Sequence, residues 1–284
     1  MSDPVMKRAE GDGIQIQLAI WEGEGQPILC VHGVTANCRC WDLIASSLAP
    51  ENKILAIDLR GRGLSDKPSS GYSLQHHIQD ICCVLDDLKQ ERIVLMGHSL
   101  GAYISLAFAA NYPERTEKLI LMDGGGQLTQ DQWDKFSLAI KPSLDRLGRV
   151  FPSFDAYVAL MKLAPFLQPW SQALEDYFQY ESEAVEGGVR SRTNPANIQE
   201  EVQNIQQEVS SKYYPKVTCP VLILRATDGI LSNDDLVLPE SAVDRMVSEI
   251  PDARRIDIEG TNHFSILLQP NEMRDKTIRE FLEK

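Results

Sequence analysis

The stretch Gly97-His98-Ser99-Leu100-Gly101 lies where an apolar run meets a run of small and apolar residues. The first run, residues 92–96, predicts a buried strand, and the second, residues 102–110, predicts a helix. A serine at that joint must occupy a tight turn, which pushes its hydroxyl clear of both elements. Glycines two residues before and after it leave room for the crossing backbone. The stretch therefore predicts a strand–turn–helix bend with the Ser99 hydroxyl at its tip.

A serine at such a bend is typical of a nucleophile, and a serine hydroxyl needs a base to take its proton at neutral pH. The usual base is a histidine, and the chain has five. With this bend, the order along the chain is serine, acid, histidine, so the base must come late. Of the five, His263 alone follows the last predicted strand, at residues 255–258. The sequence therefore predicts His263 as the base for Ser99.

A carboxylate is expected to orient the histidine, and two aspartates directly follow predicted strands. Asp228 comes after the strand at residues 221–225, and Asp123 comes after the strand at residues 118–122. Both would lie at the carboxyl edge of a parallel sheet, where the sites of open α/β folds collect. Chain order favours Asp228, and Asp123 stays open as the alternative acid. The weaker alternatives in the same loop are Asp234 and Asp235.

Attack on a carbonyl creates an oxyanion, which backbone N–H groups can stabilise. One such group should come from Leu100, the residue after the serine. The other should come from Val34, in the loop that follows a predicted strand at residues 27–31. Gly33 permits the turn that aims this N–H, and His32 is expected to brace the loop by hydrogen bonds. The sequence thus predicts an oxyanion hole formed by Val34 and Leu100.

Predicted strands alternate with predicted helices along most of the chain. This alternation predicts an α/β fold in which helices cover both faces of a mostly parallel sheet. The predicted strands are residues 13–20, 27–31, 53–57, 92–96, 118–122, 221–225 and 255–258. The predicted helices are residues 41–48, 73–88, 102–110, 240–250 and 271–283.

The middle of the chain, residues 127–212, breaks the alternation. It has no clear strand pattern and many aromatic residues, and its prolines divide it into short helices. We expect a helical cap here, inserted into a core domain of residues 1–126 and 213–284, with Gly124-Gly125-Gly126 as the hinge. Most of the aromatic side chains should form the core of the cap, and one or two should face the pocket beneath it.

Composition narrows the classes of partner and the compartment. The net charge of −13 argues against nucleic acid and anionic membranes as partners. No apolar stretch approaches the roughly 20 residues that span a bilayer, and no apolar run follows the first basic residues as in a signal peptide. The six cysteines are not spaced as a disulfide framework. We therefore expect a cytoplasmic protein with reduced thiols and a small-molecule substrate.

Several other polar residues invite a functional interpretation that the sequence does not favour. His76 and His77 are adjacent, so on a helix their side chains point about 100° apart and cannot chelate one metal side by side. Packing is the preferred interpretation for Cys38 and Cys40, because no second pair accompanies them. One interpretation of Arg190 and Arg192 is that they bind a substrate carboxylate. The preferred interpretation is that they lie on the solvated surface. The sequence predicts no metal and no cofactor.

Motifs spread along the chain resemble those of a known family. They are His32-Gly33 after a strand, the segment 58–66, the bend around Ser99, Asp228 after the penultimate strand, and Asn262-His263. With them the chain resembles the α/β-hydrolase superfamily, of the capped type. The resemblance implies an eight-stranded sheet, a Ser99–Asp228–His263 triad and an oxyanion hole from Val34 and Leu100, with the segment 58–66 as scaffold. The chain also resembles hydrolases of small amide-enoate acids, some of which take their acid from the Asp123 position.

The expected activity is hydrolysis of small carboxylic esters, lactones or amides through an acyl-enzyme on Ser99. The apolar cap indicates a substrate with hydrophobic bulk. Two alternatives would use the same triad, a carbon–carbon bond hydrolase and a cofactor-free haloperoxidase or perhydrolase. Carbon–carbon hydrolases of the family have extra glycines and a proline where Val34-Thr35-Ala36-Asn37 stands here. A ligand-binding receptor on a hydrolase fold is the alternative that is not an enzyme.

Overall fold

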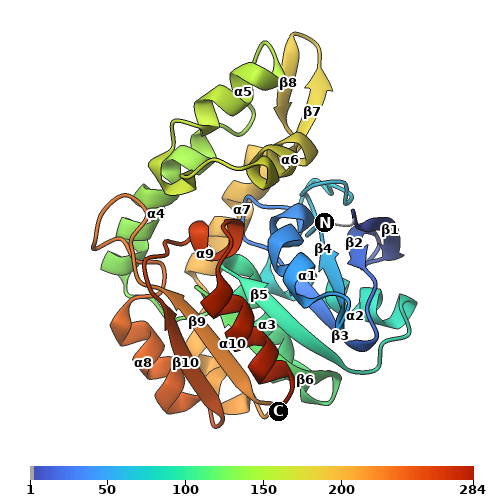
Figure 1. Ribbon diagram of the computed structural model, residues 1–284, viewed down its shortest axis with the longest axis vertical. Helices are drawn as coiled ribbons and strands as arrows, with labels where there is room; N and C mark the ends of the chain where they lie inside the picture. Colours follow the sequence, from blue (N-terminus) through green and yellow to red (C-terminus); the bar gives the residue numbers. More distant parts are fainter. Residues whose placement is uncertain (1–2) are drawn as a thin grey trace.

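The computed structural model describes residues 3–284. Its centre is an eight-stranded sheet with the strand order β1-β2-β4-β3-β5-β6-β9-β10 (Figure 1). The strands are β1 (Val5–Glu10), β2 (Gln15–Trp21), β3 (Gly25–Val31), β4 (Asn52–Ile57), β5 (Ile93–His98), β6 (Thr116–Met122), β9 (Val221–Ala226) and β10 (Ala253–Ile258). The predicted eight-stranded α/β fold is confirmed.

The sheet is parallel from β4 to β10, and its first two strands run antiparallel to their neighbours. The sequence did not locate β1. Five of its six residues are exposed, so it lacks the alternation of apolar and polar residues that marks a half-buried strand. It is an edge strand that pairs with β2 from Val5 opposite Ile20 to Glu10 opposite Gln15.

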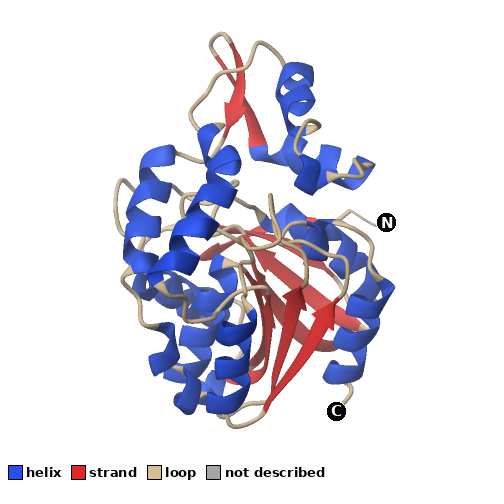
Figure 2. Cartoon of the chain, turned by 90° about the vertical axis from the view of Figure 1, so that its left-hand side faces the viewer, coloured by secondary structure: helices blue, strands red, loops and turns tan. Residues whose placement is uncertain are grey.

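Helices cover both faces of the sheet (Figure 2). Two of them, α1 (Asp42–Leu48) and α10 (Glu272–Leu282), pack together on one face. The other face carries α2 (Leu74–Asp87), α3 (Leu100–Asn111) and α8 (Glu240–Glu249). All five predicted helices are therefore present. The central α3 is buried on all sides, because it lies between the sheet and its neighbouring helices.

The chain between β6 and β9 forms an insertion that stands above the carboxyl ends of the parallel strands (Figures 1 and 2). Its helices are α4 (Gln130–Asp145), α5 (Phe154–Met161), α6 (Gln172–Glu181) and α7 (Pro195–Gln206). A helical insertion on the hydrolase-type sheet is confirmed, whereas its division from the core at residues 127–212 stays a prediction. Because the insertion covers the strand ends, any cavity there has walls from both parts.

The expectation that the insertion contains no strand is wrong. It holds a two-stranded hairpin of β7 (Ser182–Val185) and β8 (Gly188–Ser191). Each strand has four residues, too few to show a clear alternation in the sequence. The turn uses positive φ angles at Gly187 and Gly188, +87° and +143°, which glycine adopts without a steric penalty.

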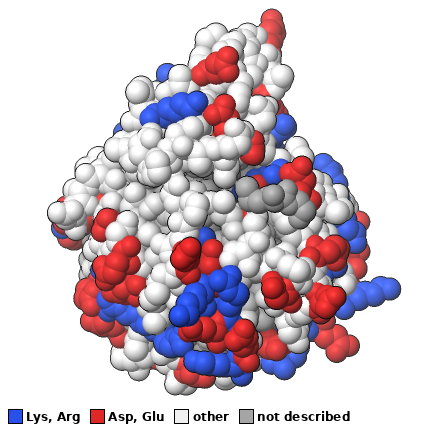
Figure 3. Space-filling view, viewed as in Figure 1, with Lys and Arg blue, Asp and Glu red and all other residues white. Residues whose placement is uncertain are grey.

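Charged side chains are distributed unevenly over the face shown in Figure 3. Acidic and basic groups are interspersed on the lower, sheet-containing part, and the surface where the insertion meets it is mostly uncharged in the left and middle of this view. Within residues 3–284, no helix is both long enough and apolar enough to cross a membrane.

Candidate active site

Ser99 lies between β5 and α3, at a bend of the kind that the sequence predicts. Its φ of +56° falls in the left-handed region, which residues other than glycine rarely adopt. The bend closes tightly, because a Cβ at Gly97 would collide with the carbonyl of Gly101, and one at Gly101 would collide with the carbonyl of Val31. The Ser99 N–H donates to the Met122 carbonyl at 3.1 Å, so β6 also holds the bend in place.

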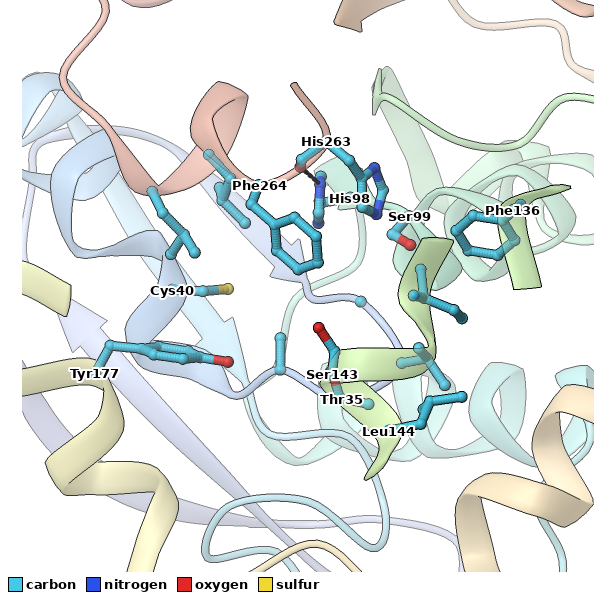
Figure 4. Close-up of a pocket in the computed structure, with 16 residues that line it drawn as sticks. Thr35, Cys40, His98, Ser99, Phe136, Ser143, Leu144, Tyr177, His263 and Phe264 are labelled. Atoms are coloured by element: carbon cyan, nitrogen blue, oxygen red, sulfur yellow. Dashed lines mark hydrogen bonds between the residues drawn. The ribbon is translucent and has the colours of Figure 1, made fainter. Parts of the chain in front are cut away.

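His263 lies in the loop after β10 and lines the same cavity as Ser99 (Figure 4). Its Nδ1 donates to Oδ2 of Asp123 at 2.7 Å. Asp123 follows β6 and is 1% exposed, and its Oδ1 accepts a hydrogen bond from the Ala226 N–H at 3.2 Å. With both oxygens engaged, the carboxylate is fixed. It keeps the ring proton on Nδ1 and leaves Nε2 of His263 as the basic nitrogen.

Asp123, the alternative acid, and not the favoured Asp228, makes the hydrogen bond to His263. The Asp228 side chain is exposed and accepts a hydrogen bond from the hydroxyl of its neighbour Thr227 at 3.2 Å. Its backbone N–H donates to the Thr261 carbonyl at 2.9 Å, so it supports the histidine loop through the main chain. Chain order could not separate the two candidates, because Asp123 also lies between the serine and the histidine.

The other polar candidates lie away from the triad. Asp235 accepts hydrogen bonds from backbone N–H groups of its own loop, and Asp234 is exposed. Arg190 and Arg192 pair with Glu183 and line neither of the cavities described below. These residues therefore hold surface loops together.

His98, inside the bend motif, is a site residue that the sequence reasoning passed over. Its ring stacks on the His263 ring with centroids 4.5 Å apart, and its Nε2 donates to the His263 carbonyl at 2.9 Å. Burial, and then the neighbouring histidine, lowers the pKa of His98 well below its ordinary value. The neutral ring therefore fixes the loop that carries His263. Its place beside the serine was the available signal.

The predicted oxyanion loop, residues 32–36, follows β3 and approaches Ser99 closely. A Cβ at Gly33 would come within 3.0 Å of the Ser99 Cβ, so glycine permits the approach. His32 braces this loop: its Nδ1 donates to the Gly33 carbonyl at 2.7 Å, and its Nε2 accepts from the Leu59 N–H at 3.0 Å. Burial lowers the pKa of His32 to about 4, which keeps the ring neutral for this pattern.

The two predicted donors lie on either side of the serine. Leu100 is the first residue of α3, so its N–H has no partner inside the helix and points out of its N-terminus. Val34 and Ser99 line the same cavity. A helix N-terminus also carries a partial positive charge, which stabilises a nearby anion. The arrangement can therefore hold a negative oxygen beside the serine.

The cavity at Ser99 is small, about 50 Å³, and adjoins a larger chamber of about 380 Å³ inside the insertion. The two share walls formed by Thr35, Ser143, Tyr177, Phe264 and Leu268. Phe136 closes the inner cavity against the His263 ring, edge to face at 6.2 Å (Figure 4). A molecule whose reacting carbonyl lies at Ser99 can thus extend into the insertion.

Both cavities offer little to a charged ligand. Among residues 3–284, neither Lys nor Arg lines the inner cavity. The chamber has two arginines: Arg146 is buried in an ion pair with Glu181, and Arg149 lies over the Phe151 ring at 5.2 Å. Most other chamber walls are aliphatic or aromatic. The site is therefore suited to a neutral, apolar molecule.

The described part of the chain contains no group of three or more His, Cys, Asp or Glu side chains placed to hold a metal ion. The adjacent histidines diverge as expected: His76 bonds to the Ser73 hydroxyl, and His77 contacts Glu201 of the insertion. Cys38 and Cys40 are free and buried, as packing predicts.

This fold and site define a hydrolase class. A family model described as alpha/beta hydrolase fold matches residues 26–270, so the chain belongs to the α/β-hydrolase family.

Relatives with named activities have sequence identities of about one quarter to this chain. The 2-(acetamidomethylene)succinate hydrolase of Mesorhizobium japonicum is 25% identical over 262 residues, covering 92% of this chain and 90% of the relative. A serine hydrolase-like protein of Danio rerio is 27% identical over 281 residues, covering 93% of this chain and 84% of the relative. The crystal structure of E-2-(acetamidomethylene)succinate hydrolase matches with a TM-score of 0.85 at 24% identity, covering 99% of this chain and 100% of that chain. At this distance the structural match supports the fold alone.

Proposed function

We propose that the protein is a serine hydrolase that cleaves neutral carboxylic esters, with Ser99 as nucleophile, His263 as base and Asp123 as the orienting acid. The observation that carries the proposal is the 2.7 Å bond from His263 Nδ1 to the buried Asp123 carboxylate. That bond leaves a basic nitrogen in the cavity that Ser99 lines. The buried Asp123 carboxylate accepts hydrogen bonds from His263 and from the Ala226 N–H. Holding this edge of the sheet together would not by itself require a histidine.

The proposed reaction follows from the positions of these groups. His263 Nε2 takes the Ser99 proton as the oxygen attacks the ester carbonyl, and the N–H groups of Val34 and Leu100 receive the oxyanion. The protonated histidine, stabilised by Asp123, then gives its proton to the leaving alcohol. Water activated by the same nitrogen hydrolyses the acyl-enzyme and restores the serine. The proton that leaves with the alcohol is replaced by one from the hydrolytic water, so the triad ends the cycle as it began it.

The choice of a neutral ester follows from the walls of the cavities. Succinate carries two carboxylates, and the Mesorhizobium relative is named for a succinate. In the inner cavity, residues 3–284 supply no cation that could neutralise such a group. Arg146 in the chamber is already paired with Glu181. Burying an unpaired carboxylate costs far more than burying an alkyl chain gains, so an apolar acyl or alcohol group is preferred.

The test is hydrolysis of p-nitrophenyl butyrate together with covalent labelling by a fluorophosphonate. We expect turnover and labelling in the natural protein, and a loss on the order of 10⁶-fold in kcat for Ser99→Ala. Ser105→Ala is the matched control, because Ser105 is a buried serine of the same helix and lines neither cavity. That variant should keep its activity.

Three outcomes would contradict the proposal. A protein that binds butyrate esters without turnover or labelling would be a receptor on this fold. A protein that cleaves a vinylogous 1,5-diketone much faster than any ester would be a carbon–carbon hydrolase, and bromination of monochlorodimedone in peroxide as the main activity would indicate a haloperoxidase.

A further inference from the structure

Helix α7 of the insertion presents a polar face to the core. Asn197, Glu200, Glu201 and Asn204 follow one another at intervals that place them on one side of the helix. The Glu200 carboxylate accepts from the N–H groups of Gly71 and Tyr72 at 3.0 Å, and the two asparagines donate to the Tyr72 hydroxyl and carbonyl at 2.6 and 3.2 Å. These contacts dock α7 on the loop before α2.

Glu201 reaches further than its neighbours, into the core. It is 2% exposed and pairs with both Arg62, which is fully buried, and His77, which is 1% exposed. Burial, and then the charge of Arg62, lowers the pKa of His77 well below its ordinary value, so the neutral ring donates from Nε2. Glu201 is thus the counter-charge for an arginine buried beneath the insertion.

Arg62 connects this pair to the oxyanion loop. Its Nε donates to the Val34 carbonyl at 3.0 Å, and its Nη1 donates to the Arg60 carbonyl at 2.9 Å. One planar guanidinium therefore touches the insertion through Glu201 and the oxyanion loop through Val34. Because the group is planar and rigid, the position of its carboxylate partner sets the direction of its other bonds.

The Val34 carbonyl matters because it belongs to the residue that is expected to supply an oxyanion donor. This carbonyl belongs to the peptide group after Val34 and the N–H to the one before it, so holding the carbonyl restricts the rotation at the Val34 Cα that orients the N–H. Donors of this kind must lie within about 0.5 Å of the productive position to be effective. His32 holds the Gly33 carbonyl, which shares a peptide group with the Val34 N–H, and Arg62 holds the peptide group that follows.

We propose that Glu201 is a positioning residue for catalysis: through Arg62 it aims the Val34 N–H, so the oxyanion hole is complete only while α7 of the insertion is docked. The inference rests on the proposed function, because it assigns a role within that hole. It makes the insertion a component of transition-state stabilisation in addition to a wall of the cavity.

The test compares Glu201→Gln with Glu200→Gln. Both variants remove one carboxylate from the docked face of α7, but only Glu201 contacts Arg62. With p-nitrophenyl butyrate, we expect Glu201→Gln to lose about 10- to 100-fold in kcat with KM within about twofold, less than the loss of a whole donor. Glu200→Gln keeps an acceptor oxygen for the Gly71 and Tyr72 N–H groups, so α7 should stay docked and kcat should change less than about threefold. Rates are normalised to active sites titrated by fluorophosphonate, which removes any effect of misfolded protein.

A second readout separates positioning from general stability. Butaneboronic acid forms a tetrahedral adduct on serine that places an oxygen in the oxyanion hole. Its affinity should fall in Glu201→Gln by the same factor as kcat/KM, and stay unchanged in Glu200→Gln. The double variant Arg62→Met/Glu201→Met, which leaves no unpaired buried charge, should show the loss of Arg62→Met alone, since the two residues act in series.

Equal kcat and boronate affinity in the two single variants, with lowered melting temperatures in both, would overturn the proposal and make Glu201 a structural residue. Additive losses in the double variant would overturn it as well. A failure of the proposed function is distinguishable, because the natural protein would then show neither ester turnover nor fluorophosphonate labelling.

Discussion

The edge of the sheet and the chamber in the insertion differ in how their side chains are held. At the sheet edge, Asp123 has a fixed partner for each oxygen, and both nitrogens of His32 are bonded. The chamber is a space of about 380 Å³ with mostly apolar walls, and its buried arginine, Arg146, is paired with Glu181. Directional bonds fix atoms, whereas apolar walls exclude water and select by shape. Under the proposed function, the sheet edge would carry the reaction and the insertion would select the substrate.

The largest effect that sharpens this comparison is expected from the two aspartates. Asp123→Asn keeps the shape of the side chain but no longer stabilises the protonated histidine, so kcat should fall on the order of 10⁴-fold. Asp228→Asn changes an exposed side chain and should leave kcat within about threefold. Steady-state kinetics with p-nitrophenyl butyrate measures both. A large loss in Asp228→Asn with an active Asp123→Asn would restore the order-based assignment.

Acid should affect the sheet part, because none of the five histidines lies in residues 127–212. Burial lowers the pKa of His32 to about 4 and that of His77 and His98 well below the ordinary value of 6.5. Between pH 6.5 and 4 the unfolded chain therefore binds protons that the folded chain does not. The free energy of unfolding should fall as the pH falls through this window, by at most about 1.4 kcal/mol per pH unit for each histidine.

Urea unfolding at pH 7, 6 and 5 checks this prediction. His77→Gln keeps a donor for Glu201 and removes one titrating group, so its stability should fall less steeply with acid. His76→Gln, at the neighbouring position outside the buried cluster, is the control. A free energy of unfolding that stays constant from pH 7 to pH 5 would contradict the expected slope.

The smallest effect concerns substrate choice and tests the insertion alone. The natural protein should prefer p-nitrophenyl octanoate over acetate in kcat/KM, and both over a mono-succinate ester. Met161→Trp fills part of the chamber and should lower kcat/KM for octanoate about tenfold while leaving acetate unchanged. Leu138→Trp, at an exposed position of α4, should change neither. Equal losses for both esters in Met161→Trp would mean that the chain does not enter the chamber.

The sequence predicted those features that local pattern determines. A glycine-flanked serine between a strand and a helix is sufficient to predict the bend at Ser99, and the order along the chain brings His263 late. The choice between Asp123 and Asp228 depends on which carboxylate points toward the histidine. Asp123 lies 140 positions before His263 and Asp228 lies 35 positions before it, and the sequence around neither residue shows which one reaches the ring. Here the left-handed backbone at Asp123, with φ of +45°, turns its side chain toward the ring.

Long-range pairs were beyond the sequence for a related reason. Along the chain, β5, β6 and most of the insertion lie between Arg62 and Glu201, and each resembles an ordinary charged residue of a loop or a helix. Both residues are buried because α7 docks on the core, and the pattern of apolar residues in neither segment predicts this docking. The hairpin β7–β8 was missed because its strands are too short to establish a period. Neither the long-range pair nor the short hairpin leaves a pattern in its own segment that predicts it.

The close approaches around Ser99 have a consequence for how such a protein can change over generations. A single added methyl at Gly97, Gly101 or Gly124 would collide with main-chain atoms, which cannot rotate away as a side chain can. These glycines therefore cannot be replaced one at a time while the bend is kept. The walls of the chamber face empty space and accept one substitution at a time. Proteins that share this bend can therefore differ widely in substrate preference while the reacting atoms keep the same positions.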